Sequence, residues 1–348
     1  MRVVKHRPFN AETPPTARLA PITETSAFFV RNHFGTPALS AATHTLHVDG
    51  AVERPLSLGV GRLQLLGARK LVVTLECAGN SRIHMRPLPP GTPWDHGAVS
   101  TGEWTGVPLY RVLEQAGLRD EATHLLFEGA DGPAEDEGER RPGYQRALPR
   151  EKALHPDTLL VWGLNGEPLP RSHGGPLRLL VPGWYGMDSV KWLARITARL
   201  EPFTGRFQGP EYTYDLGDGS PPAPVRDMRV KSQLLAPDPA EPLPLAPVEL
   251  WGRAWAGTRA IRRVEVDTSG TGQWEPAELR EPARPYGWVL WRHLWTPSAP
   301  GMHMVRVRAW DADGRVQPEQ TVPNRLGYGE HAIQVVRYEV LADRPGLQ

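Results

Sequence analysis

Residues 70 to 85 read KLVVTLECAGNSRIHM, an apolar and β-branched run that ends in a small polar turn. The VVT segment favours an extended strand, whereas the AGN segment that follows is typical of a turn. The predicted strand ends at Cys77, the single cysteine of this 348-residue chain. Because loops at strand ends commonly hold binding and catalytic groups, this junction is the first candidate for a functional site.

The segments around this strand predict a mixture of helix and strand. Residues 106–117 repeat apolar side chains at helical spacing and end in Gly117, which predicts a helix with a glycine C-cap. Further strands are predicted at residues 43–50, 123–132, 157–169, 175–186 and 189–201, with a hairpin at Asn165-Gly166. Residues 1–42 are rich in proline and predict an irregular arm.

The composition changes after the connector at residues 217–230, which is rich in glycine and proline. Beyond it, short strand-like segments recur at regular spacing, as in a small β-sandwich. Seven of the 12 tryptophans follow residue 250, enough to fill the core of such a sandwich. We therefore predict an α+β protein with a mixed domain at residues 1–225 and a sandwich at residues 226–348.

Composition and charge exclude several classes of protein. The chain has 40 Lys and Arg against 39 Asp and Glu, so its charge gives no reason to expect nucleic acid or a membrane as partner. One cysteine allows no internal disulfide and no multi-cysteine metal cage. No apolar segment follows the basic N-terminal residues, so we expect no secretory signal and a cytoplasmic location.

Common local motifs are incomplete in this sequence. GVGRLQ at residues 59–64 lacks the third glycine of a dinucleotide fingerprint, and HGGP at residues 173–176 has no accompanying G-x-S-x-G. His44 and His47 are three apart on a predicted strand and point to opposite faces. We expect both to be ordinary surface residues.

Cys77 itself has two interpretations. Most free cysteines are small buried hydrophobes. However, Gly79 lets a ligand approach closely, and a cation such as Arg82 favours the thiolate that attacks or binds metal. A Cys-His hydrolase is also possible, although no local signature supports it.

Two other segments combine cations with apolar residues. FFVRNHFG at residues 28–35 is either a loop anchored by phenylalanines or a binding segment that presents Arg31, Asn32 and His33. Residues 169–192 read LPRSHGGPLRLLVPGWYGMDSVKW, where cationic side chains punctuate strand-like runs. Such donors in apolar surroundings suit an anionic, phosphate-bearing ligand.

Together these segments resemble the sulfite oxidase family of molybdenum enzymes. F-x-R-N-H, T-L-x-C-A-G-N-x-R, W-x-x-G-A-V-S-x-x-x-W-x-G-V-x-L, F-E-G-x-D and L-P-R-x-H-G-x-P-L-R-x-x-V-P-G-x-x-G-x-x-S-V-K-W occur in this order in that family. The similarity extends over roughly residues 25 to 340 and includes the family's immunoglobulin-like dimerisation domain. Five collinear motifs and a second domain make the resemblance specific.

The resemblance implies a molybdenum cofactor with a molybdopterin ligand, oxygen-atom transfer and a homodimer. Cys77 occupies the position of the family's metal ligand, and Arg31 and Arg82 would face the metal and attract an anionic substrate. Tyr212, favoured over Tyr214 by its spacing, would lie near the reacting oxygen. The cofactor-binding residues implied by position are Phe29, Val30, Arg31, Asn32, His33, Cys77, Asp131, His173, Arg178, Ser189, Val190 and Lys191.

The sequence departs from the family pattern in the substrate pocket. Trp94 fits the pocket tryptophan of sulfite-specific members, but Pro90 stands where they have a lysine. Near the C-terminus, Leu326 occupies the position of an anion-binding arginine, and Arg325 lies one step early. One step in an extended segment turns the side chain to the other face. The motifs therefore predict the cofactor, whereas the departures concern the binding of sulfite as substrate.

Three functions remain open at this point. The first is oxidation of sulfite or a related small oxyanion, with electrons passing to an external acceptor or a separate redox subunit. The second uses the same cofactor to reduce a sulfoxide, an N-oxide or a nitrate-like substrate. The third is a cofactor-carrying or interaction module without turnover, against which the set of Cys77, Arg31 and Arg82 argues.

Overall fold

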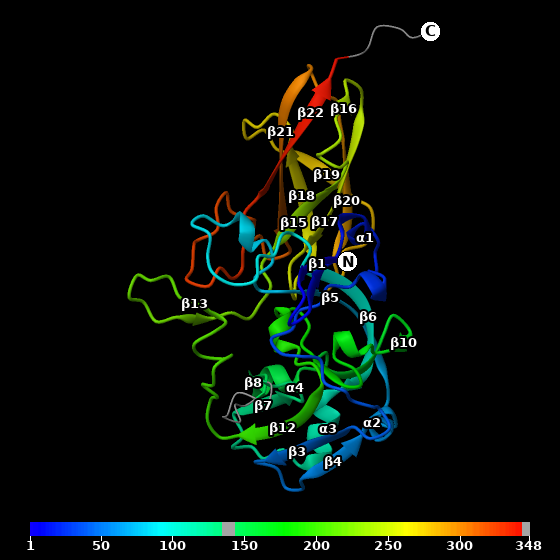
Figure 1. Cartoon of the computed structure of the whole chain (residues 1–348), viewed down its shortest axis with the longest axis vertical. Coiled ribbons are helices and arrows are strands. Elements are labelled where there is room, and N and C mark those ends of the chain that lie inside the picture. The colour runs from blue at the N-terminus through cyan, green and yellow to red at the C-terminus, as the bar shows by residue number, and fades with distance from the viewer. Residues whose placement is uncertain (134–142, 343–348) are drawn as a thin grey trace.

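The computed structural model describes residues 1–133 and 143–342 as two parts stacked along the long axis of the molecule (Figure 1). Helix α1 (Pro15–Arg18) lies beside the upper part (Figure 1), whereas the lower part carries the short helices α2 (Val60–Gln64), α3 (Leu109–Ala116) and α4 (Arg150–Leu154). Its strands are β1 (Arg2–Lys5), β2 (Asn10–Glu12), β3 (Thr45–Gly50), β4 (Leu56–Gly59), β5 (Arg69–Glu76), β6 (Val99–Pro108), β7 (His124–Gly129), β8 (Gln145–Pro149), β9 (Leu159–Leu164), β10 (Glu167–Pro168), β11 (Arg178–Leu180), β12 (Leu193–Arg199), β13 (Thr213–Tyr214) and β14 (Ala223–Pro224). The upper part contains β15 (Lys231–Ala236), β16 (Leu243–Pro244), β17 (Val248–Trp255), β18 (Ile261–Asp267), β19 (Glu275–Leu279), β20 (Val289–Trp295), β21 (Gly301–Asp311) and β22 (Gln334–Leu341).

Two five-stranded sheets organise the lower part. One has the order β10-β9-β6-β5, with β11 paired to β9, and the other has the order β4-β3-β12-β7-β8. β3 and β12 run parallel, although they are far apart in the sequence. The predicted strand ending at Cys77, the helix capped by Gly117 and the hairpin at Asn165-Gly166 are all confirmed.

The upper part is the predicted β-sandwich. Its strands follow the order β15-β17-β20-β19-β18-β21-β22-β16. Of its seven tryptophans, only Trp291 and Trp295 lie in the sandwich core. Trp255 and Trp288 instead pack on Val99 of β6, so they help to join the two parts. The expectation that tryptophans fill the core was therefore wrong, since aliphatic residues supply most of it.

The N-terminal arm is more regular than predicted. β1 and β2 form a hairpin, and Ala11 pairs with Val30 in an isolated bridge. Asn10, Ala11 and Glu12 are buried, because later segments of the chain cover them. His44 also differs from expectation, since it is buried and its Nε2 lies 2.7 Å from the carbonyl oxygen of Leu193.

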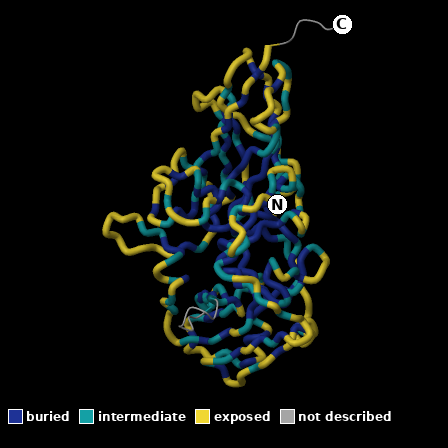
Figure 2. The backbone as a smooth tube through the Cα atoms, in the orientation of Figure 1, coloured by how far each residue is buried: buried dark blue, intermediate teal, exposed yellow. Residues whose placement is uncertain are grey.

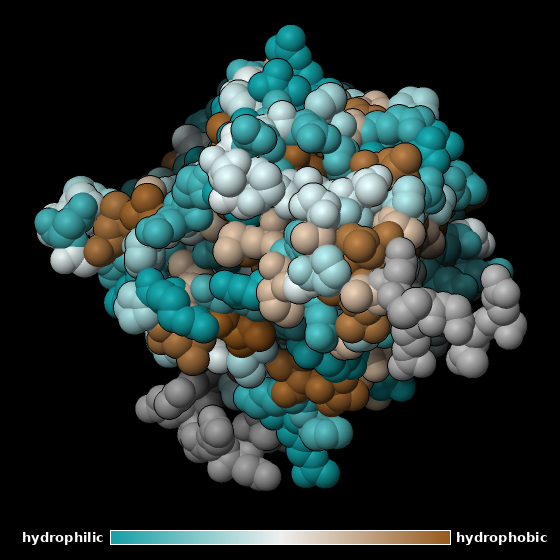
Figure 3. Space-filling view, turned by 90° about the horizontal axis from the view of Figure 1, so that it is seen from above, coloured by the Kyte–Doolittle hydropathy of each residue, from teal (hydrophilic) through white to brown (hydrophobic). Residues whose placement is uncertain are grey.

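Buried residues run through both parts, and exposed residues concentrate at the loop tips (Figure 2). Seen from the sandwich end, apolar side chains are scattered among polar ones on the surface (Figure 3). Leu294, Met302 and Leu341 are exposed apolar residues of this part. In the described ranges, every helix is too short or too polar to cross a bilayer. The domain boundary near residue 225 stays a prediction.

Candidate active site

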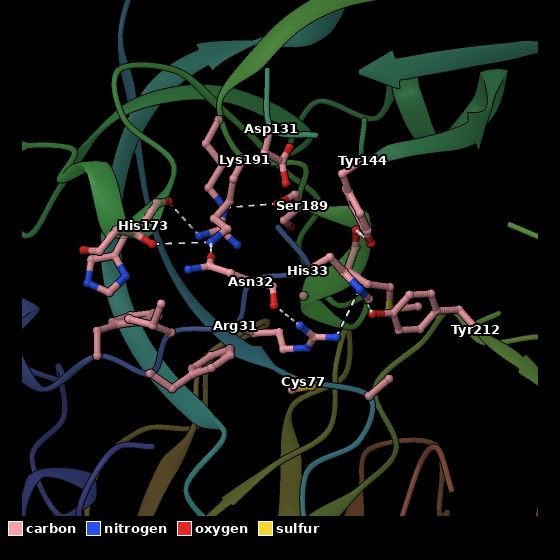
Figure 4. Close-up of a pocket in the computed structure, with 18 residues that line it drawn as sticks. Arg31, Asn32, His33, Cys77, Asp131, Tyr144, His173, Ser189, Lys191 and Tyr212 are labelled. Atoms are coloured by element: carbon pink, nitrogen blue, oxygen red, sulfur yellow. Dashed lines mark hydrogen bonds between the residues drawn. The ribbon is translucent and has the colours of Figure 1, made fainter. Parts of the chain in front are cut away.

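A pocket with about 690 Å³ of empty space lies where the three candidate segments meet (Figure 4). We call it the inner pocket. In the view of Figure 4, Cys77 lies at one side, Asp131 at the other, and Arg31 and Asn32 between them. Its walls are formed by Phe28, Phe29, Val30, Arg31, Asn32, His33, Cys77, Ala78, Asp131, Tyr144, Ser172, His173, Arg178, Gly186, Met187, Ser189, Lys191 and Tyr212.

The turn after β5 holds Cys77 in a fixed position. The Cys77 amide donates to the carbonyl of Ala98 at 2.9 Å, and the Asn80 amide donates to the carbonyl of Cys77 at 2.8 Å. A side chain at Gly79 would place its Cβ 2.4 Å from the Arg82 guanidinium, so glycine leaves the space that this guanidinium occupies. Ser81 adopts a left-handed conformation with φ of 68°, and the chain then turns toward Arg82.

Burial and nearby cations act on the Cys77 thiol in opposite directions. Burial raises its pKa above the ordinary value, while Arg31 and Arg82 lower it to a smaller extent. The predicted cationic effect is therefore present, but on its own it does not favour the thiolate. A bound metal ion removes the thiol proton outright.

Cations crowd one end of the inner pocket. Lys191 donates from Nζ to Asn32 Oδ1, and Arg178 donates to the carbonyls of Ser189 and His173 at 3.1 and 2.9 Å. Burial and the neighbouring cations lower the pKa of His173 from 6.5 to about 4. Burial lowers the pKa of Arg178 to about 9, and burial with Arg178 lowers that of Lys191 well below its usual value. These buried N–H donors suit an anionic ligand, because a bound negative charge favours the protonated forms of His173 and Lys191.

Asp131 supplies a carboxylate in this otherwise cationic pocket. Its Oδ1 is buried and has no hydrogen-bond partner among the described residues. Burial raises the pKa of Asp131 from 3.8 to about 6, against the influence of Lys191. An unpartnered buried acceptor is costly, so this oxygen is suited to accept from N–H groups of a bound ligand.

Tyr212 closes the pocket at the side of Cys77. Its hydroxyl lies 2.6 Å from His33 Nε2, and His33 stacks on Tyr144 with ring centroids 5.2 Å apart. Burial raises the pKa of Tyr212, and burial with Arg31 lowers that of His33. Both groups are therefore neutral around pH 7, and a hydrogen bond joins the phenol oxygen to the imidazole Nε2. Tyr214 lies elsewhere, beneath the Arg229 guanidinium.

A second hollow adjoins the inner pocket and opens to solvent, with about 1400 Å³ of empty space. We call it the outer chamber. Four residues border both the inner pocket and the outer chamber: Arg31, His33, Cys77 and Tyr212. The residues that border the outer chamber but not the inner pocket include Arg82, Trp94, Glu211, Arg325, Leu326 and Tyr328. Arg82 donates to the carbonyls of Leu326 and Thr92 at 3.2 and 2.8 Å. It makes no ion pair within the described residues, so its charge is available to a ligand.

Arg325 is held at the rim of this chamber. Its Nε donates to Asp215 Oδ2 at 2.8 Å, and its Nη2 donates to the carbonyl of Pro210 at 3.0 Å. Leu326 packs against the hydrophobic core and offers only its backbone carbonyl to Arg82. Arg325 therefore does not take the place of a third free cation beside Cys77.

Most predicted site residues lie together, with two exceptions. Val190 is buried in the hydrophobic core and does not line the inner pocket, and Arg82 lines the outer chamber only. The sequence analysis missed six lining residues, Phe28, Ala78, Tyr144, Ser172, Gly186 and Met187. Five of them adjoin predicted residues or lie within the quoted motifs. Tyr144 gave no local signal, because only the folded chain stacks it on His33.

A separate cluster contains His84, Asp95 and His96, whose possible ligand atoms lie within 4.8 Å of one another. The two imidazole rings are stacked at 4.1 Å with an angle of 4° between their planes. Lone pairs in parallel planes do not converge on one ion, so this arrangement is unsuited to a shared metal. His84 instead pairs with Asp95 at 2.7 Å.

Comparison with known families agrees with this geometry. Residues 33–207 match the oxidoreductase molybdopterin binding domain, and residues 223–336 match the Mo-co oxidoreductase dimerisation domain. These two matches define a molybdopterin-dependent oxidoreductase.

Similar proteins narrow the class further. Sulfite oxidase of Gallus gallus is 36% identical over 349 residues, which cover 93% of this chain and 74% of that protein. A nitrate reductase of Hordeum vulgare is 32% identical and is covered over 40% of its length. The solved structure of the sulfane dehydrogenase SoxCD from Paracoccus pantotrophus superimposes with a TM-score of 0.86 at 28% identity, covering 97% of this chain and 88% of that one. The chain therefore belongs to the sulfite oxidase family of molybdenum–molybdopterin oxidoreductases.

The inner pocket fits the cofactor of this family. The unpartnered Asp131 Oδ1 suits the N–H groups of a pterin, and Arg178, His173 and Lys191 suit its phosphate. Cys77 offers the soft sulfur that molybdenum accepts as a ligand. The donors thus match the metal, the pterin and the phosphate.

Proposed function

We propose that this protein oxidises sulfite or a related small oxyanion, and that the outer chamber admits the substrate to the metal. The observation that carries the proposal is the position of Arg31 and Arg82, which both border the chamber that contains Cys77. Their described hydrogen-bond acceptors are carbonyl oxygens and, for Arg31, the His33 ring, so neither guanidinium is neutralised by a carboxylate. Two such charges attract an anion and hold it near the metal.

The reaction gives the residues of the chain defined tasks. The bound cofactor supplies two-electron oxygen-atom transfer, so sulfite and water yield sulfate, two protons and two electrons. Arg31 and Arg82 orient the anion, while Tyr212 presents a neutral hydroxyl that a hydrogen bond with His33 Nε2 holds in place. Trp94 and Tyr328 add aromatic surface to the lining of the chamber. The electrons pass to an external acceptor or a separate redox subunit.

The charge of the chamber bears on the choice of oxyanion. Arg325 is paired with Asp215 and Glu211 with Arg206, while Lys5 adds a further cation to the lining. A dianion therefore meets two free arginines rather than three. Weaker binding of sulfite, or preference for an anion of lower charge, follows from this arrangement.

The test is reduction of ferricyanide by protein produced in a host that makes molybdopterin. We expect sulfite-dependent reduction by the wild type, and loss of activity and of molybdenum in Cys77→Ala. Metal content is measured by mass spectrometry on each preparation. Wild-type protein without stoichiometric molybdenum would contradict the proposal, because the proposed reaction needs the metal.

Reduction of a nitrate-like substrate is the second candidate. The similarity to a nitrate reductase and the presence of only two free arginines favour it, because nitrate carries a single charge. This alternative would be supported if metal-loaded protein showed no activity with millimolar sulfite but oxidised a reduced dye in the presence of nitrate, a sulfoxide or an N-oxide.

We further propose that two chains associate through the sandwich part. The match to a dimerisation domain supports this, as do exposed apolar residues on β20, β21 and β22 such as Leu294, Met302 and Leu341. Light scattering should give twice the chain mass at micromolar concentration. A monomer would contradict this part of the proposal.

A further inference from the structure

The turn that carries Cys77 is attached to the sandwich part by a buried polar network. Glu76, the last residue of β5, is buried and lies directly before Cys77. Its Oε1 accepts from Asn80 Nδ2 at 2.9 Å and from Lys231 Nζ at 3.3 Å. Its Oε2 accepts from Trp255 Nε1 at 2.9 Å. Both carboxylate oxygens are thus satisfied, and two of the three donors come from the other part of the chain.

Lys231 and Trp255 are themselves held rigidly. They are register partners on β15 and β17, so they lie side by side, and Figure 1 shows these two strands close to β5. Lys231 Nζ also donates to Ser81 Oγ at 2.9 Å and to the Glu330 carbonyl at 2.7 Å. The ammonium group of Lys231 therefore has three hydrogen-bond acceptors, and two of them, on Glu76 and Ser81, belong to the segment around Cys77.

Backbone contacts reinforce the same attachment. The Gly329 amide donates to the carbonyl of Ala78 at 2.7 Å, and Arg82 donates to the carbonyl of Leu326 at 3.2 Å. Within the turn, Asn80 Oδ1 accepts from the Ala98 amide at 3.0 Å. The turn is thus held between Ala98, directly before β6, and the sandwich part.

We propose that Lys231 and Trp255 are positioning residues of the metal site, acting through Glu76. The proposal rests on the proposed function, because it takes Cys77 as the metal ligand. A carboxylate one residue before a metal-bound thiolate adds negative charge at the site, and Lys231 offsets it. Groups that orient and neutralise the surroundings of a metal ligand commonly tune the metal. The sandwich part therefore completes the metal site in addition to any role in assembly.

The variants separate charge from shape. Lys231→Met keeps the length of the side chain without its charge, and Trp255→Phe keeps the ring without the N–H donor. Glu76→Gln removes the negative charge, and the double variant Glu76→Gln/Lys231→Met removes both charges. Trp288→Phe is the matched control, since Trp288 also lies between the two parts but donates to the Pro21 carbonyl and not to the turn.

Two measurements decide the proposal. The first is hydrogen exchange of the amides of residues 77–82 in cofactor-free protein. Loss of a buried partner should speed it roughly tenfold or more in Lys231→Met and Trp255→Phe, with no change in Trp288→Phe. The second is the midpoint potential of the metal-loaded protein, followed by the paramagnetic resonance signal of the metal. We expect Lys231→Met to lower it, Glu76→Gln to raise it and the double variant to return toward the wild type.

The possible failures are distinguishable. Wild-type exchange rates in Lys231→Met and Trp255→Phe, or equal acceleration in Trp288→Phe, would overturn the positioning role. Unchanged potentials in both single-charge variants would overturn the electrostatic role. If the wild-type protein bound no molybdenum, the proposed function would fail, while the exchange experiment would still decide whether the sandwich part holds the turn. If Trp255→Phe did not fold, the charge variants and the double variant would decide the outcome.

Discussion

Replacing Arg82 by Met tests the role of the outer chamber most directly. Arg82 is buried, and it is bound by the carbonyl oxygens of Leu326 and Thr92 and lies against the Tyr328 ring. No carboxylate of the described residues forms an ion pair with it. The guanidinium charge is therefore free for the substrate, and the variant should lose substrate binding rather than a structural ion pair.

The magnitude follows from the kind of contact that is lost. A hydrogen bond between charged partners contributes about 1.5 to 3 kcal/mol. Since about 1.4 kcal/mol corresponds to a factor of ten, kcat/KM should fall about 10- to 150-fold at 25 °C. Arg82→Lys keeps the positive charge but loses the planar guanidinium, so its kcat/KM should lie between those of Arg82→Met and the wild type.

The assay is sulfite-dependent reduction of ferricyanide, normalised to molybdenum content. Arg86→Met is the control, because Arg86 also donates to backbone carbonyls, those of Ile83 and Met85, yet it is exposed and borders neither pocket. Raising the salt concentration should weaken sulfite binding more in the wild type than in Arg82→Met. The reasoning would be refuted if Arg82→Met stayed within about threefold of the wild type, below the range for a charged contact. Equal losses of kcat/KM in Arg82→Met and Arg86→Met would also refute the reasoning.

Four further outcomes are expected. Arg325→Leu removes an exposed ion pair worth at most about 1 kcal/mol and an exposed hydrogen bond to the Pro210 carbonyl, so kcat/KM for sulfite should change less than about fivefold. Asp131→Leu should lower the molybdenum content per chain by removing both acceptor oxygens from the inner pocket, and wild-type molybdenum content in this variant would contradict the assigned pterin contact. Burial lowers the pKa of His331 from 6.5 to about 3, so the unfolded chain binds this proton more readily and stability falls as the pH drops below 6.5. Urea unfolding at about pH 7 and about pH 4.5 should therefore show a smaller loss of stability in His331→Gln than in the wild type. Arg146→Met leaves the fully buried Asp188 carboxylate unpaired and should lower the unfolding free energy by about 3 to 5 kcal/mol, whereas a loss below about 1 kcal/mol would mean that the carboxylate takes up a proton instead.

Local sequence patterns predicted the elements that carry the site. The β-branched run before Cys77 forms β5, the apolar repeat before Gly117 forms α3, and Asn165-Gly166 forms a hairpin. These features depend on backbone preference and on side-chain periodicity over a few consecutive residues. Both can be read from the local sequence without knowledge of the rest of the chain. The collinear motifs likewise indicated the family and most residues of the inner pocket.

Contacts between distant segments were beyond such patterns. The N-terminal hairpin is regular because Ala11 pairs with Val30 and Thr13 donates to the Gly97 carbonyl, which no local pattern reveals. Tyr144 joins the pocket by stacking on His33 across more than a hundred residues. The prediction that the tryptophans of the second part fill its core was wrong, because composition gives the number of tryptophans but not the residues that they contact.

The sequence by itself determined that a strand presents Cys77 at a turn, and that cations gather near it. Only the tertiary structure decided which charges remain free, since hydrogen bonds join residues far apart in the chain. Arg82 keeps its charge for a ligand because carbonyl oxygens hold it, whereas Arg325 is neutralised by Asp215. Glu76 is satisfied only because β15 and β17 bring Lys231 and Trp255 against the end of β5.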